Sequence, residues 1–453
     1  MTIAVSQNTR YEESSKSVFT WEEVRKNNTR ASCWIVVNGD VFDVTHWLPK
    51  HPGGEVVIID SSGTDATDLF NAYHGPKARR MLAPYKIGRV GPYKIDAVTA
   101  EFRKLAASVE SSDLMVVEPA FYVKLVMWYF ALLGAAIFCV VCGPESFVVS
   151  VLFGGVFMGA FLQQVAFFGH DLGHTAVFHN RKLDSTIGIL FGNALSGVSV
   201  GWWKATHNTH HCNTNSVSGD PDIQHVPFLA ISSSMLQSFF STYHERTFVW
   251  GIVGRFLIPF QSRLYYVIMS LARFNLYAQS YLFLLRGHEF VRRRVKTHRA
   301  VELGGLFSFF AWFSFLLSFF PRIDWMVWFI FVSHAIAGIL HVQITLSHFS
   351  MPVYEGGHPL GDESFLQHQL KTCLDIDCPE WLDWVHGGLQ FQLCHHLFPR
   401  VPRCNLRNLQ DVVKCFCQSH GLEYHHMGFL AANKRMIARL EEVGGSLRFN
   451  KMR

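Results

Sequence analysis

The sequence predicts a small α+β domain followed by an all-α membrane domain with about four transmembrane helices and a histidine-rich cap on the cytosolic side. Three observations indicate this fold class. Residues 18–93 alternate short strand-like and helical segments, long apolar runs follow them, and 24 of the 453 residues are histidine. Only 17% of the residues are charged, and an uncharged run of about 18 residues spans a bilayer as a helix. The net charge of +5 is too small to indicate a nucleic-acid partner.

The first domain is expected over residues 18–93. The segment from Cys33 to Val44, CWIVVNGDVFDV, reads as two strands around an Asn-Gly-Asp turn, and charged helical stretches are expected to follow through Arg89. Residues 94–120 read as a polar linker that is partly helical. The first twenty residues are polar and contain no apolar signal core, so we expect no cleavable secretory signal and a cytosolic N-terminus. The ten cysteines are scattered, which argues against a disulfide framework.

The membrane domain is expected over residues 121–430, with residues 431–453 as a C-terminal tail. Stretches 183–203 and 248–287 are amphipathic and suit the membrane interface, although 183–203 could also be a re-entrant or buried helix. The basic run Arg292–Lys296 predicts a cytosolic loop before the third span, and an even number of spans then places both termini in the cytosol. The candidate spans are Phe121 to Val141, Ser146 to Phe168, Leu303 to Phe320 and Asp324 to Leu346.

The tetrapeptide His51-Pro52-Gly53-Gly54 is by itself compatible with a plain turn. The longer segment HPGGEVVIIDSSGTDATDLFNAYH, however, resembles the cytochrome b5 family, and the resemblance runs from Phe19 to Gly88. It implies that His51 and His74 are the axial ligands of a haem b. Two imidazoles leave no open position on the iron, so such a haem carries electrons and does not bind oxygen. Apolar candidates for the pocket wall are Val56, Val57, Ile58, Leu69 and Phe70.

Three further groups of histidines follow, each near an expected membrane edge. On a helix, residues at i, i+3 and i+4 share a face, so each group aims its imidazoles at one point. Imidazole-rich sites suit iron, zinc or copper. Seven histidines and one glutamine are too many for one tetrahedral metal and indicate a dinuclear centre. The groups are His170 and His174; His207, His210 and His211; and Gln392, His395 and His396.

His348 is a further candidate metal ligand, because it falls at the cytosolic end of the fourth span. His341 lies near the same end, and either histidine could equally be an interfacial residue. Among polar neighbours, Asp171 and Asn208 could fix the tautomer of a metal-bound imidazole. Asp220 and Asp222 could do the same from further away, or could be helix-cap or turn residues.

The order of the histidine groups, the fused haem domain and Gln392 at the start of the third group resemble the front-end membrane desaturases. The segments GVSVGWWKATHNTHH, GDPDIQHVPFLAIS and GGLQFQLCHHLFPRVPRCNLR resemble the plant-type branch, which holds sphingolipid long-chain-base Δ8 desaturases and acyl Δ6 desaturases. Cys394 departs from the family, which commonly has Glu there, and we expect it to tune the site from beside the ligands. Trp202, Trp203 and Lys204 precede the second group and read as interface anchors, or alternatively as residues of a substrate entrance.

This resemblance implies two iron ions that use O2 as co-substrate, a long-chain lipid substrate and a catalytic set made of the three groups above. It also implies electrons from NADH through a separate cytochrome b5 reductase, and the endoplasmic reticulum membrane as location. The flanking segments favour Δ8 of a sphingoid base; fatty acyl Δ5, Δ6 or Δ8 desaturation is the alternative, followed by a lipid hydroxylase with a fused haem domain. A non-catalytic electron carrier needs only one span, and a metal transporter would place its histidines near the bilayer midplane.

Overall fold

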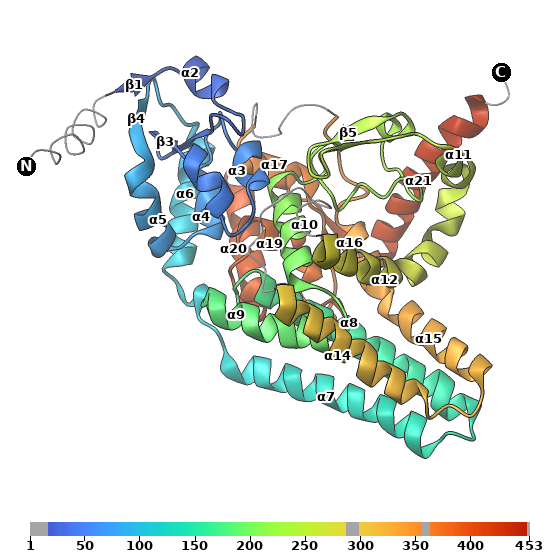
Figure 1. Ribbon diagram of the computed structural model, residues 1–453. Coiled ribbons are helices and arrows are strands. Elements are labelled where there is room, and N and C mark those ends of the chain that lie inside the picture. Colours follow the sequence, from blue (N-terminus) through green and yellow to red (C-terminus); the bar gives the residue numbers. More distant parts are fainter. Residues whose placement is uncertain (1–16, 287–298, 356–362, 451–453) are drawn as a thin grey trace, which may run out of the picture.

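The computed structural model describes residues 17–286, 299–355 and 363–450 (Figure 1). The N-terminal residues 1–16 and the basic run Arg292–Lys296 lie outside the described residues. In Figure 1 the α+β domain lies at the upper left and the long apolar helices run along the bottom, while the elements of a cap fill the centre and the upper right. This arrangement is the predicted fold class.

The N-terminal domain is built on a four-stranded sheet in the order β1-β4-β3-β2. In the hairpin of β2 and β3, Val37 pairs with Asp40, and the intervening Asn38 and Gly39 have φ of 53° and 77°. A tight hairpin requires this left-handed pair, so the turn predicted from the sequence is confirmed. The strands are β1 (Val18–Phe19), β2 (Trp34–Val37), β3 (Asp40–Asp43) and β4 (Lys86–Val90).

The prediction that helical stretches continue through Arg89 is wrong. Helix α5 ends at Leu82, and Lys86–Val90 forms strand β4, which pairs with both β1 and β3. The charges that looked helical lie at the sheet, where Lys86 and Arg89 form ion pairs with Asp40 at 2.8 and 3.3 Å. The helices of this domain are α2 (Trp21–Lys26), α3 (Val56–Asp60), α4 (Thr67–Tyr73) and α5 (Pro76–Leu82).

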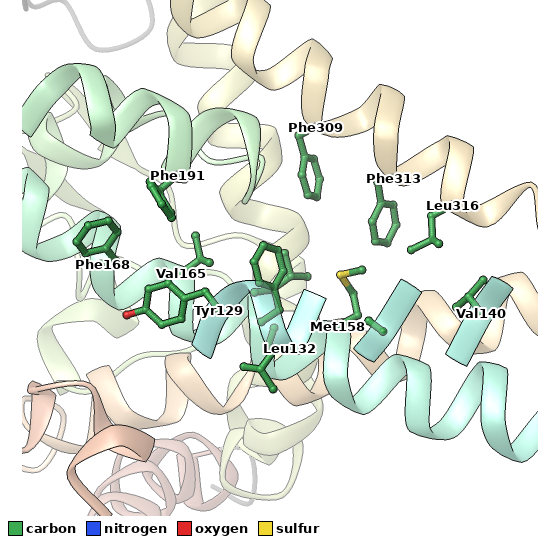
Figure 2. Close-up of a cluster of buried hydrophobic side chains, with 14 of the residues drawn as sticks. Tyr129, Leu132, Val140, Met158, Val165, Phe168, Phe191, Phe309, Phe313 and Leu316 are labelled. Atoms are coloured by element: carbon green, nitrogen blue, oxygen red, sulfur yellow. The ribbon is translucent and has the colours of Figure 1, made fainter. Parts of the chain in front are cut away.

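Within the described residues, four helical stretches are long and apolar enough to cross a membrane, as predicted. They pack side by side, and apolar side chains fill the space between them (Figure 2). Met158 and Val165 lie opposite Phe309 and Phe313 in this cluster. The helices are α7 (Pro119–Cys142), α8 (Gly154–Gly173), α14 (Arg299–Leu317), and α15 (Ile323–Ala337) continued by α16 (Ile339–Leu346).

Glycines on α8 allow α15 to pack very closely against it. A Cβ added at Gly159 would lie 2.5 Å from the carbonyl oxygen of Ser333, and one at Gly155 would lie 2.8 Å from the Val332 side chain. Small residues at such contacts are how membrane helices gain van der Waals packing without help from the hydrophobic effect. The close contact holds the first half of α8 against α15, and the first histidine group lies at the other end of α8.

The cap is formed by segments on both sides of the third span. The stretch 183–203, for which three placements were open, is mostly buried from Phe191 onward: Asn193 is fully buried and donates to the carbonyl of Glu302 at 3.2 Å, whereas Leu183 and Leu190 are exposed. The cap helices and strands are α9 (Arg181–Gly188), a π-helical turn (Ile189–Ala194), α10 (Val200–Cys212), β5 (Phe239–Ser241), β6 (Arg246–Phe248), α11 (Ile252–Leu257), α12 (Gln261–Arg286), α17 (Phe365–Thr372), β7 (Asp375–Asp377), α18 (Asp383–His386), α19 (Gln392–Leu397), α20 (Leu406–Ser419), β8 (His426–Gly428) and α21 (Phe429–Asn450).

The C-terminal segment differs from the tail expected over 431–453. Helix α21 buries Ala432, Met436, Leu440 and Val443 in one hydrophobic cluster with residues of α12 and α16. These four residues recur at intervals of three and four, which is the period of an amphipathic helix. The segment is therefore part of the cap.

The linker over 94–120 contains helix α6 (Ala97–Glu110), which contacts both domains. Arg103 forms ion pairs with Asp65 at 2.9 Å and with Asp68 at 2.7 Å, both in the N-terminal domain. On the cap side, the ring of Phe102 lies 6.0 Å from that of Phe398 and 6.5 Å from that of Phe365. The linker thus fixes the two domains relative to each other.

Candidate metal centre and haem site

His51 and His74 face each other in the N-terminal domain, with 6.0 Å between their ring centroids. Nδ1–H of His51 donates to the carbonyl of Gly54 at 2.7 Å, and Nδ1–H of His74 donates to that of Phe70 at 3.0 Å. Both Nε2 atoms are therefore left as electron-pair donors, as axial haem ligands require. A Cβ at Gly53 would lie 3.1 Å from the His51 ring, so a side chain there would crowd the ligand.

The environment keeps both imidazoles neutral. Burial lowers the pKa of His51, and burial together with the neighbouring His51 lowers the pKa of His74 to about 4. Because only a neutral imidazole offers a lone pair to iron, this environment fits a haem. Phe70 stacks on His74 at 4.4 Å, as a wall residue should, whereas Val57 and Leu69 pack into a cluster shared with the cap.

Seven of the histidines outside the haem domain converge as two groups near the end of α8. The donor atoms within each group all lie within 4.8 Å of one another. Helix α10 supplies members to both groups because its i and i+3 positions share a face. The first group is His170, His174, His207 and His395, and the second is His210, His348 and His396.

The two remaining predicted residues join these groups. Nε2 of His211 lies 3.1 Å from Nε2 of His207 and 3.1 Å from Nε2 of His395, in the first group. Its ring also stacks on His396 at 4.0 Å, so it stands between the groups. The amide nitrogen of Gln392 lies 2.9 Å from Nε2 of His348 and 3.0 Å from Nε2 of His396, in the second group. His341 belongs to neither group.

The charge state of these residues fits metal binding. Burial lowers the pKa of His174, His211, His395 and His396 well below its ordinary value, and neighbouring imidazoles add to the effect. Neutral imidazoles whose Nε2 atoms approach to 3.1 Å carry lone pairs that repel one another unless a cation or proton lies between them. The donor set of nitrogens and one amide is one that iron, zinc or copper accepts.

For four of the ligand histidines, a hydrogen bond to Nδ1 fixes which nitrogen faces the group. His210 donates to Asp220 at 2.8 Å, and His207 donates to Asp222 at 3.3 Å. Further along the chain, His396 pairs with Gln369 at 2.8 Å, and His348 donates to the carbonyl of Thr372 at 3.1 Å. Each bond places the proton on Nδ1 and directs Nε2 toward its group.

The aspartates oppose the effect of burial on these imidazoles. Burial acts to lower the pKa of His210, but the Asp220 carboxylate outweighs it and the pKa is raised. For His207 burial dominates and lowers the pKa to about 3 despite Asp222. Burial acts to raise the pKa of Asp222, yet the hydrogen bond from His207 and the charge of His210 hold it at about 2.

The expected roles of Asp171 and Asn208 are not found. Asp171 accepts two hydrogen bonds from Arg403 at 2.6 and 2.8 Å, and its other oxygen is 3.8 Å from Nδ1 of His170. A bidentate guanidinium is the stronger partner, so Asp171 holds Arg403 instead of orienting the ligand. Among the described residues, no hydrogen bond joins Asn208 to a ligand histidine.

The interface-anchor interpretation is also wrong for the two tryptophans. Trp202 is only 9% exposed, and Trp203 stacks on His207 at 4.4 Å and lies 5.2 Å from His170. Gly173 leaves the space for this ring, since a Cβ there would lie 2.0 Å from it. Lys204 is held in the cap, where burial and Arg181 lower its pKa to about 8.

Cys394 faces away from the metal-binding nitrogens. Its Sγ lies 4.0 Å from the hydroxyl of Tyr424, which donates to the buried Asp375, and burial raises the pKa of the thiol. The Asp375 carboxylate also accepts the backbone N–H of Leu393 at 2.9 Å, which anchors the third group. The sequence analysis missed this anchor and Gln369, because neither lies close in sequence to the histidine it supports.

The fatty acid desaturase family matches residues 146–428, and the cytochrome b5-like haem/steroid binding domain matches residues 20–91. The chain is 35% identical to a Delta(8)-fatty-acid desaturase of Borago officinalis, with 94% of each chain covered. It is 36% identical to an acyl-lipid (9-3)-desaturase of the same plant, again over 94% of each chain. It is 34% identical to a Delta 8-(E)-sphingolipid desaturase of Komagataella phaffii, over 95% of this chain and 94% of that one. The chain therefore belongs to the fatty acid desaturase family and is a front-end membrane lipid desaturase with a fused cytochrome b5-like domain.

Proposed function

We propose that this desaturase introduces a double bond at Δ8 of a sphingolipid long-chain base, with two iron ions in the histidine groups and O2 as co-substrate. The observation that carries the proposal is the convergence of seven histidines into two groups, with His211 and Gln392 beside them, at the end of the membrane helices. Two groups with separate hydrogen-bonded supports suit two metal ions better than one.

The substrate class rests on the relatives and on the flanking segments. The Komagataella relative is named for Δ8 sphingolipid desaturation. The segments around the second and third groups resemble the plant-type branch, which holds both sphingolipid Δ8 and acyl Δ6 desaturases, and we take them to favour the sphingoid base. The second candidate is a fatty acyl desaturase, which the similarity to the acyl-lipid (9-3)-desaturase favours at nearly the same identity. Both candidates use the same histidines and differ in the lipid that enters.

Iron bound at these groups would supply the O2-dependent removal of two hydrogens from adjacent methylenes, which no amino-acid side chain can perform. The side chains of the site bind the metals, orient the ligand imidazoles and enclose the centre. Asp220 and Gln369 hold His210 and His396 in one tautomer, so that Nε2 is available as a ligand. Trp203 stacks on His207, and the imidazoles of His174 and His207 are buried, which would screen the metal site from bulk water.

Electrons would enter one at a time through a haem b held by His51 and His74. NADH and a separate cytochrome b5 reductase are the source that we propose. Because α6 fixes the haem domain against the cap, every metal centre has its own haem nearby, which replaces a bimolecular encounter with an intramolecular step. We place the protein in the endoplasmic reticulum membrane with both termini in the cytosol, where that reductase reaches the haem.

Lipid analysis of yeast that expresses the chain tests the proposal. Long-chain bases and supplied polyunsaturated acids are profiled together, and double bonds are located by mass spectrometry. His396→Ala should abolish the product, whereas His426→Ala should not, because His426 is exposed, pairs with Asp377 and belongs to neither group. A new Δ8 bond in the bases supports the sphingolipid assignment. A new bond only in the fatty acids moves the assignment to the acyl candidate, and a hydroxylated product contradicts desaturation.

A further inference from the structure

Tyr73 connects the haem site to the histidine groups. It is the last residue of α4 and precedes the haem ligand His74 in the chain. Its ring stands edge-on to the ring of His211 at 90°, with 6.0 Å between centroids, and lies 6.4 Å from the ring of His174. One peptide unit and one ring contact therefore join a haem ligand to the metal-binding side chains.

The contact is held by packing on both sides. Tyr73 packs against a hydrophobic cluster that includes Leu69 of the haem domain and Cys212 of α10. Around it, Asn213 donates to Asp60 at 2.9 Å, and the two residues come from different domains. The position of the ring is thus set by the docked interface between the domains.

Hydrogen bonding does not explain why an aromatic residue stands here. The hydroxyl of Tyr73 is buried and has no hydrogen-bond partner among the described residues. Leaving a buried hydroxyl unpaired is unfavourable, so the hydroxyl itself does not hold the domains together. What the residue supplies at this position is its ring, placed against His211 and His174.

We infer that the Tyr73 ring is the contact through which electrons pass from the haem domain to the di-metal centre, an inference that rests on the proposed function. One electron leaves the ferrous haem, which becomes ferric, and reduces one ferric non-haem iron to ferrous. No bond forms or breaks, and the phenol is neither oxidised nor deprotonated. Tyr73 is a positioning residue of the electron path and does not touch the lipid.

The test is flash reduction of the haem in the full-length protein, loaded with haem and ferric non-haem iron and kept free of oxygen. Reoxidation of the haem is followed by its visible absorption. Tyr73→Leu should slow the first-order reoxidation several-fold, while Tyr73→Phe, which keeps the ring, should match the wild type. Because a first-order rate constant does not depend on the fraction of protein that is loaded, partial loss of a cofactor in a variant does not blur the comparison.

Arg30→Ala is the matched control. It removes the ion pair with Glu245 at 2.8 Å, another contact between the domains, together with the ion pair to Glu55 at 2.7 Å inside the haem domain, and should leave the reoxidation rate unchanged. The haem spectrum and the iron content of each variant are recorded as well. Equal rates in Tyr73→Leu and wild type would overturn the assignment of Tyr73 alone. If the wild-type haem is not reoxidised at all, although both metals are bound, the proposed function itself fails.

Discussion

Nδ1 of His210 lies 2.8 Å from a carboxylate oxygen of Asp220, and neither side chain is exposed to solvent by more than 2%. The same carboxylate accepts the backbone N–H of Asn215 at 2.8 Å, so the loop after α10 holds the aspartate while the aspartate holds the imidazole. The hydrogen bond keeps the proton of a ligand histidine on Nδ1, so that Nε2 is always free to bind a metal. The loop is therefore as much a part of the second histidine group as the ligands are.

Replacing Asp220 with asparagine should weaken metal binding at the second group. The carboxylate favours the proton on Nδ1 of His210, and loss of such a partner costs about 10–100-fold in metal affinity or activity. Non-haem iron per chain and desaturated product are measured together. Asp377→Asn is the matched control, because Asp377 pairs with a histidine at the exposed surface, and both readouts should stay at the wild-type level. Unchanged iron binding in Asp220→Asn would show that the pair is only structural.

Replacing His74 with alanine should abolish haem binding without removing the non-haem iron, since the two sites share no ligand. The reason is that one imidazole does not hold a haem whose pocket is built for two. His46→Ala serves as the control, because His46 is exposed and belongs to no site. Haem absorbance and non-haem iron are compared per chain. Full retention of haem in His74→Ala would exclude His74 as an axial ligand.

Breaking the buried pair of Arg403 and Asp171 should destabilise the protein strongly. Arg403→Leu leaves the carboxylate buried and unpaired, for which the typical cost is about 3–5 kcal/mol. Adding Asp171→Asn to the same chain should recover part of the loss, because the uncompensated charge disappears. The exposed pair of Arg322 and Asp324 gives the control: Arg322→Ala should leave the stability nearly unchanged, because solvent screens an exposed ion pair. Unfolding in detergent measures all of these variants.

Lys204 should make the free energy of unfolding depend on pH in the alkaline range. Its folded-state pKa of about 8 lies below the ordinary value of 10.5, so folding favours the neutral amine. The stability that comes from the neutral amine is fully present above pH 10.5 and is lost as the pH falls toward 8. At neutral pH the buried amine is charged and destabilises the folded protein. Lys204→Met should therefore stabilise the protein at pH 7, and the gain should shrink as the pH rises from 8 to 10.5. A gain that is equal at pH 7 and pH 10 would refute this reasoning.

The sequence predicts those parts of the site that depend on local spacing. His207, His210 and His211 lie within five consecutive residues, so helical geometry alone brings them together. Gln369 supports His396 across 27 residues and Asp375 anchors the backbone of Leu393 across 18, and such pairs form only through the tertiary fold. Short-range patterns contain no trace of them.

The predicted and the observed fold differ at strand β4 and at helix α21, and the two differences have a similar origin. Strand β4 is only five residues long and carries two charges, so its pattern is weaker than that of the charged helix before it. Helix α21 has its apolar residues at helical spacing, but their burial against α12 depends on a surface that the cap creates. Tyr73 shows most clearly what the sequence does not reveal. It precedes the haem ligand His74 in the chain, but its ring contacts His174 and His211 of the metal centre.

The most direct measurement is the iron content of the purified full-length protein, with haem iron and non-haem iron determined separately. Two histidine groups and one pair of haem ligands predict two non-haem irons and one haem in each chain. His396→Ala should lower the non-haem iron and leave the haem unchanged. A wild-type protein that binds haem but holds at most one non-haem metal, while still forming the double bond, would contradict the dinuclear centre.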